Sequence, residues 1–223
     1  VYPEKLAELC ALFETEAQRY GVYPLRDASA RRGGDYAPPH SMEGHSKMTY
    51  GPMHIRMPEH GVINLKNTSY RISATVTLDA AGQGVIACQG GNMAGWSLYL
   101  DQNSRPSFVY NWFGHEFTTL VGEPLAPREH QIDVQYAHDG GFAAGGELKL
   151  LVDGGLVAEG RVERTVPVIF SMSGETFDVG RDTGSPVGKY PHDFAFTGVI
   201  HGVTLERLAE PSKEVKQQER KGA

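Results

Sequence analysis

The pattern of hydrophobic and polar positions changes along the chain, and its first part is helical. From Pro3 to Tyr20, apolar side chains recur at three- and four-residue steps, as they do on one face of an amphipathic helix. Pro3 suits the first turn of such a helix, and Gly21 suits the position just past its end. The chain is therefore predicted to begin with a helix whose apolar face needs a partner.

The larger part of the chain has the two-residue period of strands. Apolar residues at every second position from Tyr70 to Leu78 alternate with polar ones, which predicts a half-buried strand with one face in water. Similar runs lie at residues 96–100, 132–135, 148–152 and 156–160. An Asp153-Gly154 pair joins the last two runs and predicts a tight hairpin. A β-bulge near His201-Gly202 would keep the last strand facing inward.

These patterns define the expected organisation. No helical pattern separates the strands, so the fold class is all-β: a two-sheet antiparallel jelly-roll sandwich with one N-terminal helix. The helical segment takes residues 1–25, and an arm or linker without a period takes residues 26–47. The sandwich takes residues 48–208, and residues 209–223, rich in Lys, Glu and Gln, form a disordered tail.

Composition and charge narrow the class of partner. With 27 glycines, 13 prolines and 40% hydrophobic residues, the chain resembles a turn-rich globular protein with enough apolar material for a core. Its net charge of −6 provides no basic surface for nucleic acid, and no apolar run is long enough to cross a membrane. Cys10 and Cys88 have no metal-ligand spacing, and both are predicted to be buried thiols.

No common catalytic motif is present in the sequence. The paired carboxylates of a glycosidase at strand spacing are missing, and so is a phosphate-binding Walker loop. The segment Met172-Ser173-Gly174 lacks the first glycine of a serine nucleophile elbow. No catalytic residue is therefore expected.

A candidate metal site lies in the polar segment Asp178–Pro186. Asp178 and Asp182, with nearby hydroxyls and carbonyls, offer the oxygen ligands that Ca²⁺ prefers. The alternative is structural: an Asp–Arg ion pair and turn capping would tie the loop to the sandwich. The sequence leaves both alternatives open.

A candidate ligand surface comes from Tyr110, Trp112 and His115, which lie on one strand and the turn after it. Exposed rings can stack on sugars, so these residues suggest a glycan site. Packing in the core, or a structural histidine, is the alternative for each of them. Trp96 alternates with apolar residues and is expected in the core.

Several segments together resemble the C-terminal part of bacterial arylsulfatases. The run Pro3–Leu9, Leu12–Ala17 and Tyr20–Leu25 resembles the last helix and exit strand of the sulfatase core. The segments that resemble the additional concanavalin-like or laminin-G-like domain of long arylsulfatases are Gly90-Gly91 with Gly95–Tyr99, Tyr110–Gly114, Leu151–Gly154, Gly160–Pro167, Asp178–Val187 and Phe196–Ile200.

This resemblance implies a non-catalytic accessory domain of a sulfate-ester hydrolase, contributing to assembly, stability or substrate access. Its expected partner is the sulfatase core of a larger protein. In the isolated chain, the apolar face of the helix would instead pack on the sandwich or on a second copy of the chain. The residues after Cys10 and Cys88 do not match the Cys-x-Pro/Ala-x-Arg segment that is converted to formylglycine, so no catalytic residue is carried over. The alternative function is a lectin-like carbohydrate-binding module, with or without Ca²⁺.

Overall fold

The computed structural model describes residues 2–23, 41–42 and 44–209 of the chain. It contains two compact units, residues 1–38 and 39–223. Most of the predicted arm at 26–47 lies outside the described residues, and so does the predicted tail at 209–223 except Ala209. Among the described residues, no helix is both long and apolar enough to cross a membrane.

The first unit contains the predicted helix, α1 (Pro3–Arg19). Gly21 follows it in the left-handed region, with φ at +64°, which suits a residue without a Cβ. Residues 20–23 form a turn and an irregular stretch, and the end of the predicted exit strand at 24–25 lies outside the described residues. Cys10 is exposed, so the prediction of a buried thiol is wrong there and right at Cys88.

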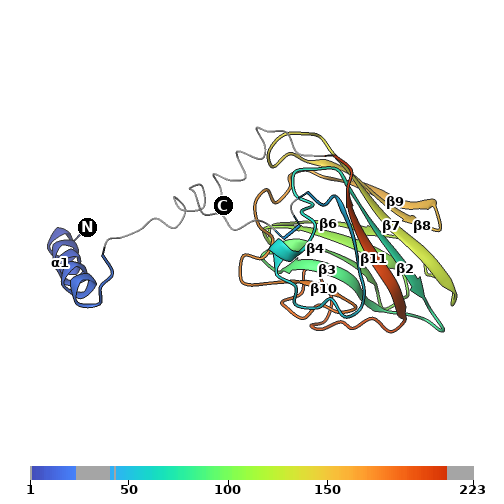
Figure 1. Ribbon diagram of the computed structural model, residues 1–223, viewed down its shortest axis with the longest axis horizontal. Coiled ribbons are helices and arrows are strands. Elements are labelled where there is room, and N and C mark those ends of the chain that lie inside the picture. Colours follow the sequence, from blue (N-terminus) through green and yellow to red (C-terminus); the bar gives the residue numbers. More distant parts are fainter. Residues whose placement is uncertain (1, 24–40, 43, 210–223) are drawn as a thin grey trace. The chain divides into compact units, whose positions relative to one another are not determined.

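The second unit is a sandwich of two antiparallel sheets (Figure 1), which confirms the predicted fold class. Its strands are β1 (Lys47–Tyr50), β2 (Tyr70–Thr77), β3 (Gly84–Gly91), β4 (Ala94–Leu100), β5 (Pro106–Trp112), β6 (Glu116–Val121), β7 (Glu129–His138), β8 (Gly146–Val152), β9 (Gly155–Val162), β10 (Phe177–Val179) and β11 (Val199–Arg207), with a short 3₁₀ helix, η1 (Glu59–Gly61), before β2.

The order of the strands differs from their order along the chain. The six-stranded sheet runs β1-β11-β2-β7-β8-β9, and the five-stranded sheet runs β10-β3-β4-β5-β6. Figure 1 shows the two layers, with β3, β4 and β10 in one and β2, β7 and β11 in the other. Strands far apart in sequence, such as β2 and β11, therefore become neighbours and present their outward residues together.

The local signals of the sequence are found where they were predicted. β2 alternates between buried and half-buried residues along its whole length. Asp153 and Gly154 have φ values of +50° and +82° in the hairpin between β8 and β9, as the primed hairpin turns require. The register of β11 against β2 shifts between Ile200 and Gly202, which confirms the predicted bulge.

The main core fills the space between the sheets. Its largest fully buried side chains include Trp96, Tyr50 and Phe108, and the rings of Trp96 and Phe108 stack with centroids 6.2 Å apart. The indole N–H of Trp96 donates a hydrogen bond of 3.2 Å to Gln89 Oε1. The expectation that Trp96 belongs to the core is confirmed.

A second, smaller hydrophobic cluster covers the other face of the five-stranded sheet. It contains the outward-facing Val85, Cys88, Tyr99 and Val109, together with Val187 and Phe194 from the segment that precedes β11. As a result β3 and β4 are buried at every position. The outer face of the six-stranded sheet keeps its polar alternate positions, and the open surface of the sandwich lies there.

Candidate ligand-binding site

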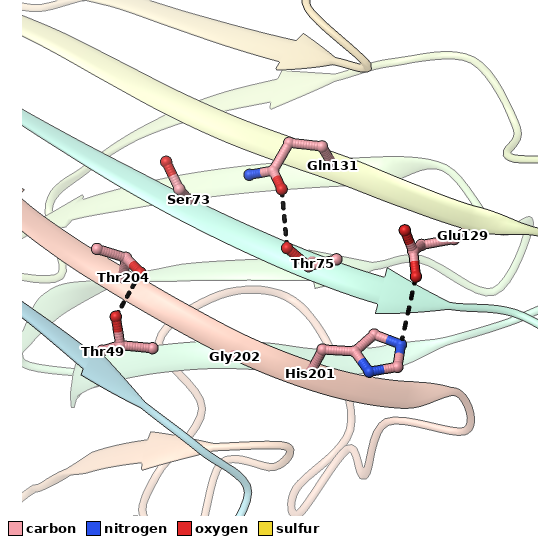
Figure 2. A pocket seen from close by; sticks show the side chains of 8 residues that line it. All are labelled: Thr49, Ser73, Thr75, Glu129, Gln131, His201, Gly202 and Thr204. Carbon is pink, nitrogen blue, oxygen red and sulfur yellow. Dashed lines mark hydrogen bonds and ion pairs between the residues drawn. The ribbon is translucent and has the colours of Figure 1, made fainter.

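A shallow hollow of about 410 Å³ lies on the outer face of the six-stranded sheet. Its lining comes from four neighbouring strands: Thr49 from β1, His201, Gly202 and Thr204 from β11, Ser73 and Thr75 from β2, and Glu129 and Gln131 from β7. We call this set the polar hollow. Figure 2 shows the side chains rising from the strands on the same face.

Hydroxyl and amide groups in the polar hollow are paired across the strands (Figure 2). Thr49 and Thr204 share a hydrogen bond of 2.8 Å between their hydroxyls. Thr75 Oγ1 donates to Gln131 Oε1 over 2.8 Å, and Ser73 donates to Asp133 beside the hollow. Cross-strand pairs of this kind fix side chains on a rigid sheet, so the polar groups are held in place before any ligand arrives.

The bulge in β11 decides the shape of one end of the hollow. His201 is the extra residue, without a partner in the register with β2. Its Nε2 lies 2.8 Å from Thr77 Oγ1 and 3.8 Å from Glu129 Oε2. Gly202 has no side chain to fill the adjacent part of the hollow. A Cβ at this position would lie only 3.1 Å from Thr49 Cγ2. The bulge thus turns an imidazole toward the hollow and removes a side chain beside it.

The structure separates the three residues of the predicted ligand surface. Tyr110 is buried in the main core, where its hydroxyl accepts a 2.8 Å hydrogen bond from Val166 N–H, and burial raises the pKa of Tyr110. Trp112 and His115 remain together at the end of the β5–β6 hairpin, with ring centroids 6.4 Å apart. The guanidinium of Arg164 covers the Trp112 ring at 3.8 Å. Tyr110 therefore offers no surface to a ligand, and one face of Trp112 is occupied.

The two aspartates of the candidate metal site lie together in the interior. Asp178 and Asp182 are each 1% exposed. Asp178 Oδ2 accepts hydrogen bonds from the backbone N–H and the hydroxyl of Thr183, which is the geometry of turn capping. Arg181 pairs with Asp193 at 3.5 Å rather than with Asp178. The loop is thus tied to β10 through Asp178.

Sequence reasoning did not identify most of the polar hollow. The alternation from Tyr70 to Leu78 placed Ser73 and Thr75 on a wet face. It could not bring Thr49, Gln131 and Thr204 to the same place, because their strands are distant in sequence and their pairing order is set by the whole fold. The signal available in the sequence was the two-residue alternation of each strand, which shows which of its side chains point outward.

Comparisons with known proteins give no family for this chain. No protein-family model and no curated protein match it. The CBM40 module of the Ruminococcus gnavus IT-sialidase, solved with α2,3-sialyllactose, is 15% identical over 77% of this chain and 91% of that chain, with a TM-score of 0.49.

Two further solved structures give similar values. A leech intramolecular trans-sialidase is 13% identical over 77% of this chain and 26% of that chain, with a TM-score of 0.48. A putative carbohydrate-binding protein from Bacteroides ovatus is 13% identical over 78% of this chain and 43% of that chain, with a TM-score of 0.44. None of the three scores reaches 0.5, so the function has to be argued from the residues of this chain. Nothing found in these comparisons supports an arylsulfatase origin.

Proposed function

We propose that the sandwich is a non-catalytic carbohydrate-binding module whose binding site is the polar hollow. The observation that carries this proposal is the array of hydroxyl, amide, carboxylate and imidazole groups on the open face of the six-stranded sheet. A hydroxyl both donates and accepts hydrogen bonds, and an amide side chain does the same through two atoms. Such an array complements the adjacent hydroxyl groups of a sugar ring.

The geometry of His201 favours binding over catalysis. A catalytic base is oriented by a third group on the ring nitrogen that does not face the nucleophile. Here Thr77 and Glu129 both approach the same nitrogen, Nε2. Thr77, His201 and Glu129 are therefore not arranged as a proton relay, and we assign His201 to ligand contact.

The polar hollow predicts weak binding. Ligand pockets with high affinity combine apolar walls with a few polar groups, whereas the lining of this hollow contains no Phe, Tyr, Trp, Leu, Ile, Val or Met side chain. We expect dissociation constants on the order of 1 mM for a monosaccharide, or about −4 kcal/mol. Useful avidity would require several sites acting together.

A glycan array, followed by NMR titration of the sugars that bind, tests the proposal. The variant T75V/Q131A removes a donor and an amide at the centre of the hollow and is expected to weaken binding about thirtyfold, since each of the two lost hydrogen bonds contributes about 1 kcal/mol. K149A is the matched control, because Lys149 is exposed on β8 in the same sheet but does not line the hollow. Equal binding by T75V/Q131A and the wild type, or no binding to any glycan, would overturn the proposal.

A second candidate function is the accessory domain of an arylsulfatase-type hydrolase, and α1 is the observation that favours it. Leu6, Leu9, Leu12 and Phe13 on α1 are 49–64% exposed. A helix that exposes this many apolar side chains suits packing against a protein partner. Hydrolysis of a nitrophenyl sulfate by the purified chain would contradict both candidates.

A further inference from the structure

Three groups that can bind a metal meet below the segment that covers the five-stranded sheet. Cys88 on β3 and Asp178 on β10 are direct partners in the strand register, and Asp182 follows in the covering segment. None of the three residues is more than 1% exposed. One ligand atom from each lies within 4.8 Å of the other two.

The hydrogen bonds of the cluster leave one buried oxygen unused. Asp178 Oδ1 accepts from Arg56 N–H at 2.5 Å, and its Oδ2 accepts from Thr176 and Thr183. Asp182 Oδ2 accepts from the Tyr190 hydroxyl at 2.7 Å and from Val187 N–H at 3.2 Å.

Asp182 Oδ1 is different, because it is buried and has no hydrogen-bond partner. Buried polar atoms are nearly always paired, so this carboxylate oxygen beside Cys88 and Asp178 is open to a ligand. Burial raises the pKa of Asp182, hydrogen bonds from Tyr190, Val187 and Gly184 oppose this shift, and the neighbouring Asp178 carboxylate adds to it. Among the described residues, no Lys or Arg side chain forms an ion pair with Asp178 or Asp182, and Arg181 beside them is paired with Asp193.

We propose that Cys88, Asp178 and Asp182 form a binding site for a divalent cation of the Zn²⁺ class. The thiol decides the class of metal. Ca²⁺ takes oxygen ligands only, whereas Zn²⁺ accepts thiolate and carboxylate ligands together. Asp178 and Asp182 alone suggested Ca²⁺ as one alternative, and including Cys88 changes the proposed ion to a softer one.

The surroundings of the three side chains suit a structural ion. The Cys88 thiol donates a 3.6 Å hydrogen bond to the Arg181 carbonyl oxygen. Metal binding would release this thiol proton, and the freed carbonyl oxygen would then be close enough to complete a four-coordinate site. A bound ion would neutralise the paired carboxylates and join β3, β10 and the covering segment. The site lies on the sheet opposite the polar hollow, so its occupancy is independent of glycan binding.

The experiment uses the full chain after treatment with a chelator. Zn²⁺, Co²⁺ and Ca²⁺ are added in turn, and the Tm, the metal content per chain and the absorption spectrum are measured. We expect one Zn²⁺ per chain, a higher Tm with Zn²⁺ but not with Ca²⁺, and a thiolate-to-metal charge-transfer band with Co²⁺. D182N and C88A should bind Zn²⁺ at least about tenfold more weakly, a factor of the size seen when groups around a metal are removed.

The matched control is C10S, which removes the exposed cysteine and should leave Zn²⁺ binding and the Co²⁺ band unchanged. If C88A does not fold, D182N and the Co²⁺ spectrum of C10S decide the question. A wild-type chain that binds no Zn²⁺, or a D182N variant that binds Zn²⁺ as tightly as the wild type, would overturn the proposal.

Discussion

At the residue scale, Glu59 and Lys66 form a buried ion pair in the sandwich. The side chains of Lys66 and Glu59 are only 7% and 13% exposed, and Nζ lies 2.5 Å from Oε1. The other carboxylate oxygen accepts hydrogen bonds from Phe170 and Ser171 N–H, at 3.0 and 2.9 Å. The pair therefore ties η1 to the segment that follows β9.

Removing one member of this pair should be costly. K66M leaves the Glu59 charge buried without its partner, and we expect it to lower the free energy of unfolding by about 3 kcal/mol. The double variant E59Q/K66M should lose less than the sum of the two single losses, because neither charge is then left alone. Urea denaturation of K66M, E59Q and the double variant measures the three losses in the free energy of unfolding.

The control for this prediction is K47M. Lys47 pairs with Glu206 on the surface, where its side chain is 59% exposed, and such pairs contribute less than about 1 kcal/mol. A loss in K66M no larger than the loss in K47M would show that the buried pair does not stabilise the fold.

The same pair predicts a dependence of stability on pH. Burial opposes ionisation of Glu59, but Lys66 and the N–H groups of Ser171 and Phe170 outweigh it and lower the pKa of Glu59 below 4.5. The folded state then holds this proton less tightly than the unfolded state. The stabilisation by Glu59 is complete at pH values above the ordinary pKa of a glutamate. It is lost as the pH falls through the lowered pKa that Glu59 has in the folded state. Between about pH 6 and pH 3 the wild type should lose more stability than E59Q.

At the element scale, two glycines with similar backbone angles should respond differently to substitution. Gly90 at the β3–β4 hairpin has φ at +88°, and Gly154 in the β8–β9 turn has φ at +82°. A Cβ on Gly90 would lie 2.1 Å from the Ala94 carbonyl oxygen, whereas a Cβ on Gly154 would have no neighbour within 4 Å. An added side chain would meet the same backbone strain at both positions, but only at Gly90 would it collide with a neighbouring atom.

We therefore expect G154A to lower the free energy of unfolding by about 1 kcal/mol, the cost of a left-handed alanine. G90A should lower it by more than about 3 kcal/mol, because the strand pair has to open to admit the methyl group. Thermal unfolding of both variants measures the difference. Equal losses would show that the close approach at Gly90 relaxes without cost.

The elements themselves were largely predictable from sequence. The two-residue period of apolar positions predicted β2, and the Asp153-Gly154 pair predicted the hairpin between β8 and β9. The bulge was predicted because Ile200 and Val203 must both face inward. These signals are local, since each depends on a few neighbouring residues and on the chirality of the backbone.

The site was harder to predict, because it depends on which faces are covered. Alternation shows that Tyr110 and Trp112 share a face, but it does not say that this face of β5 is the inner one. Both faces of β5 are buried, since Val109 packs against the segment containing Val187 and Phe194. The pairing of Cys88 with Asp178 is likewise set by the position of β10 beside β3.

At the scale of the whole molecule, the two outer faces of the sandwich serve different purposes. The five-stranded sheet is covered by the segment before β11, which contributes Val187, Tyr190 and Phe194 to a second hydrophobic cluster. The six-stranded sheet keeps hydroxyl and amide groups at its outward positions. The covered face is suited to stability and to the proposed metal site, and the open face is suited to ligand binding.

The same division predicts that the sandwich folds without the first unit. Among the residues that the structure describes, the second unit builds both of its hydrophobic clusters from its own side chains, from Met42 onward. The helix α1 has 17 residues, only slightly more than the length of about 12–15 residues below which isolated helices are marginal in water. We expect residues 39–223 alone to keep the Tm within about 2 °C, a change of less than about 1 kcal/mol for a domain of this size. The peptide 2–23 alone should be mostly unfolded by circular dichroism. Full-length protein measured at the same molar concentration is the control, and a Tm lower by more than about 4 °C in the shortened chain would show that the first unit stabilises the sandwich.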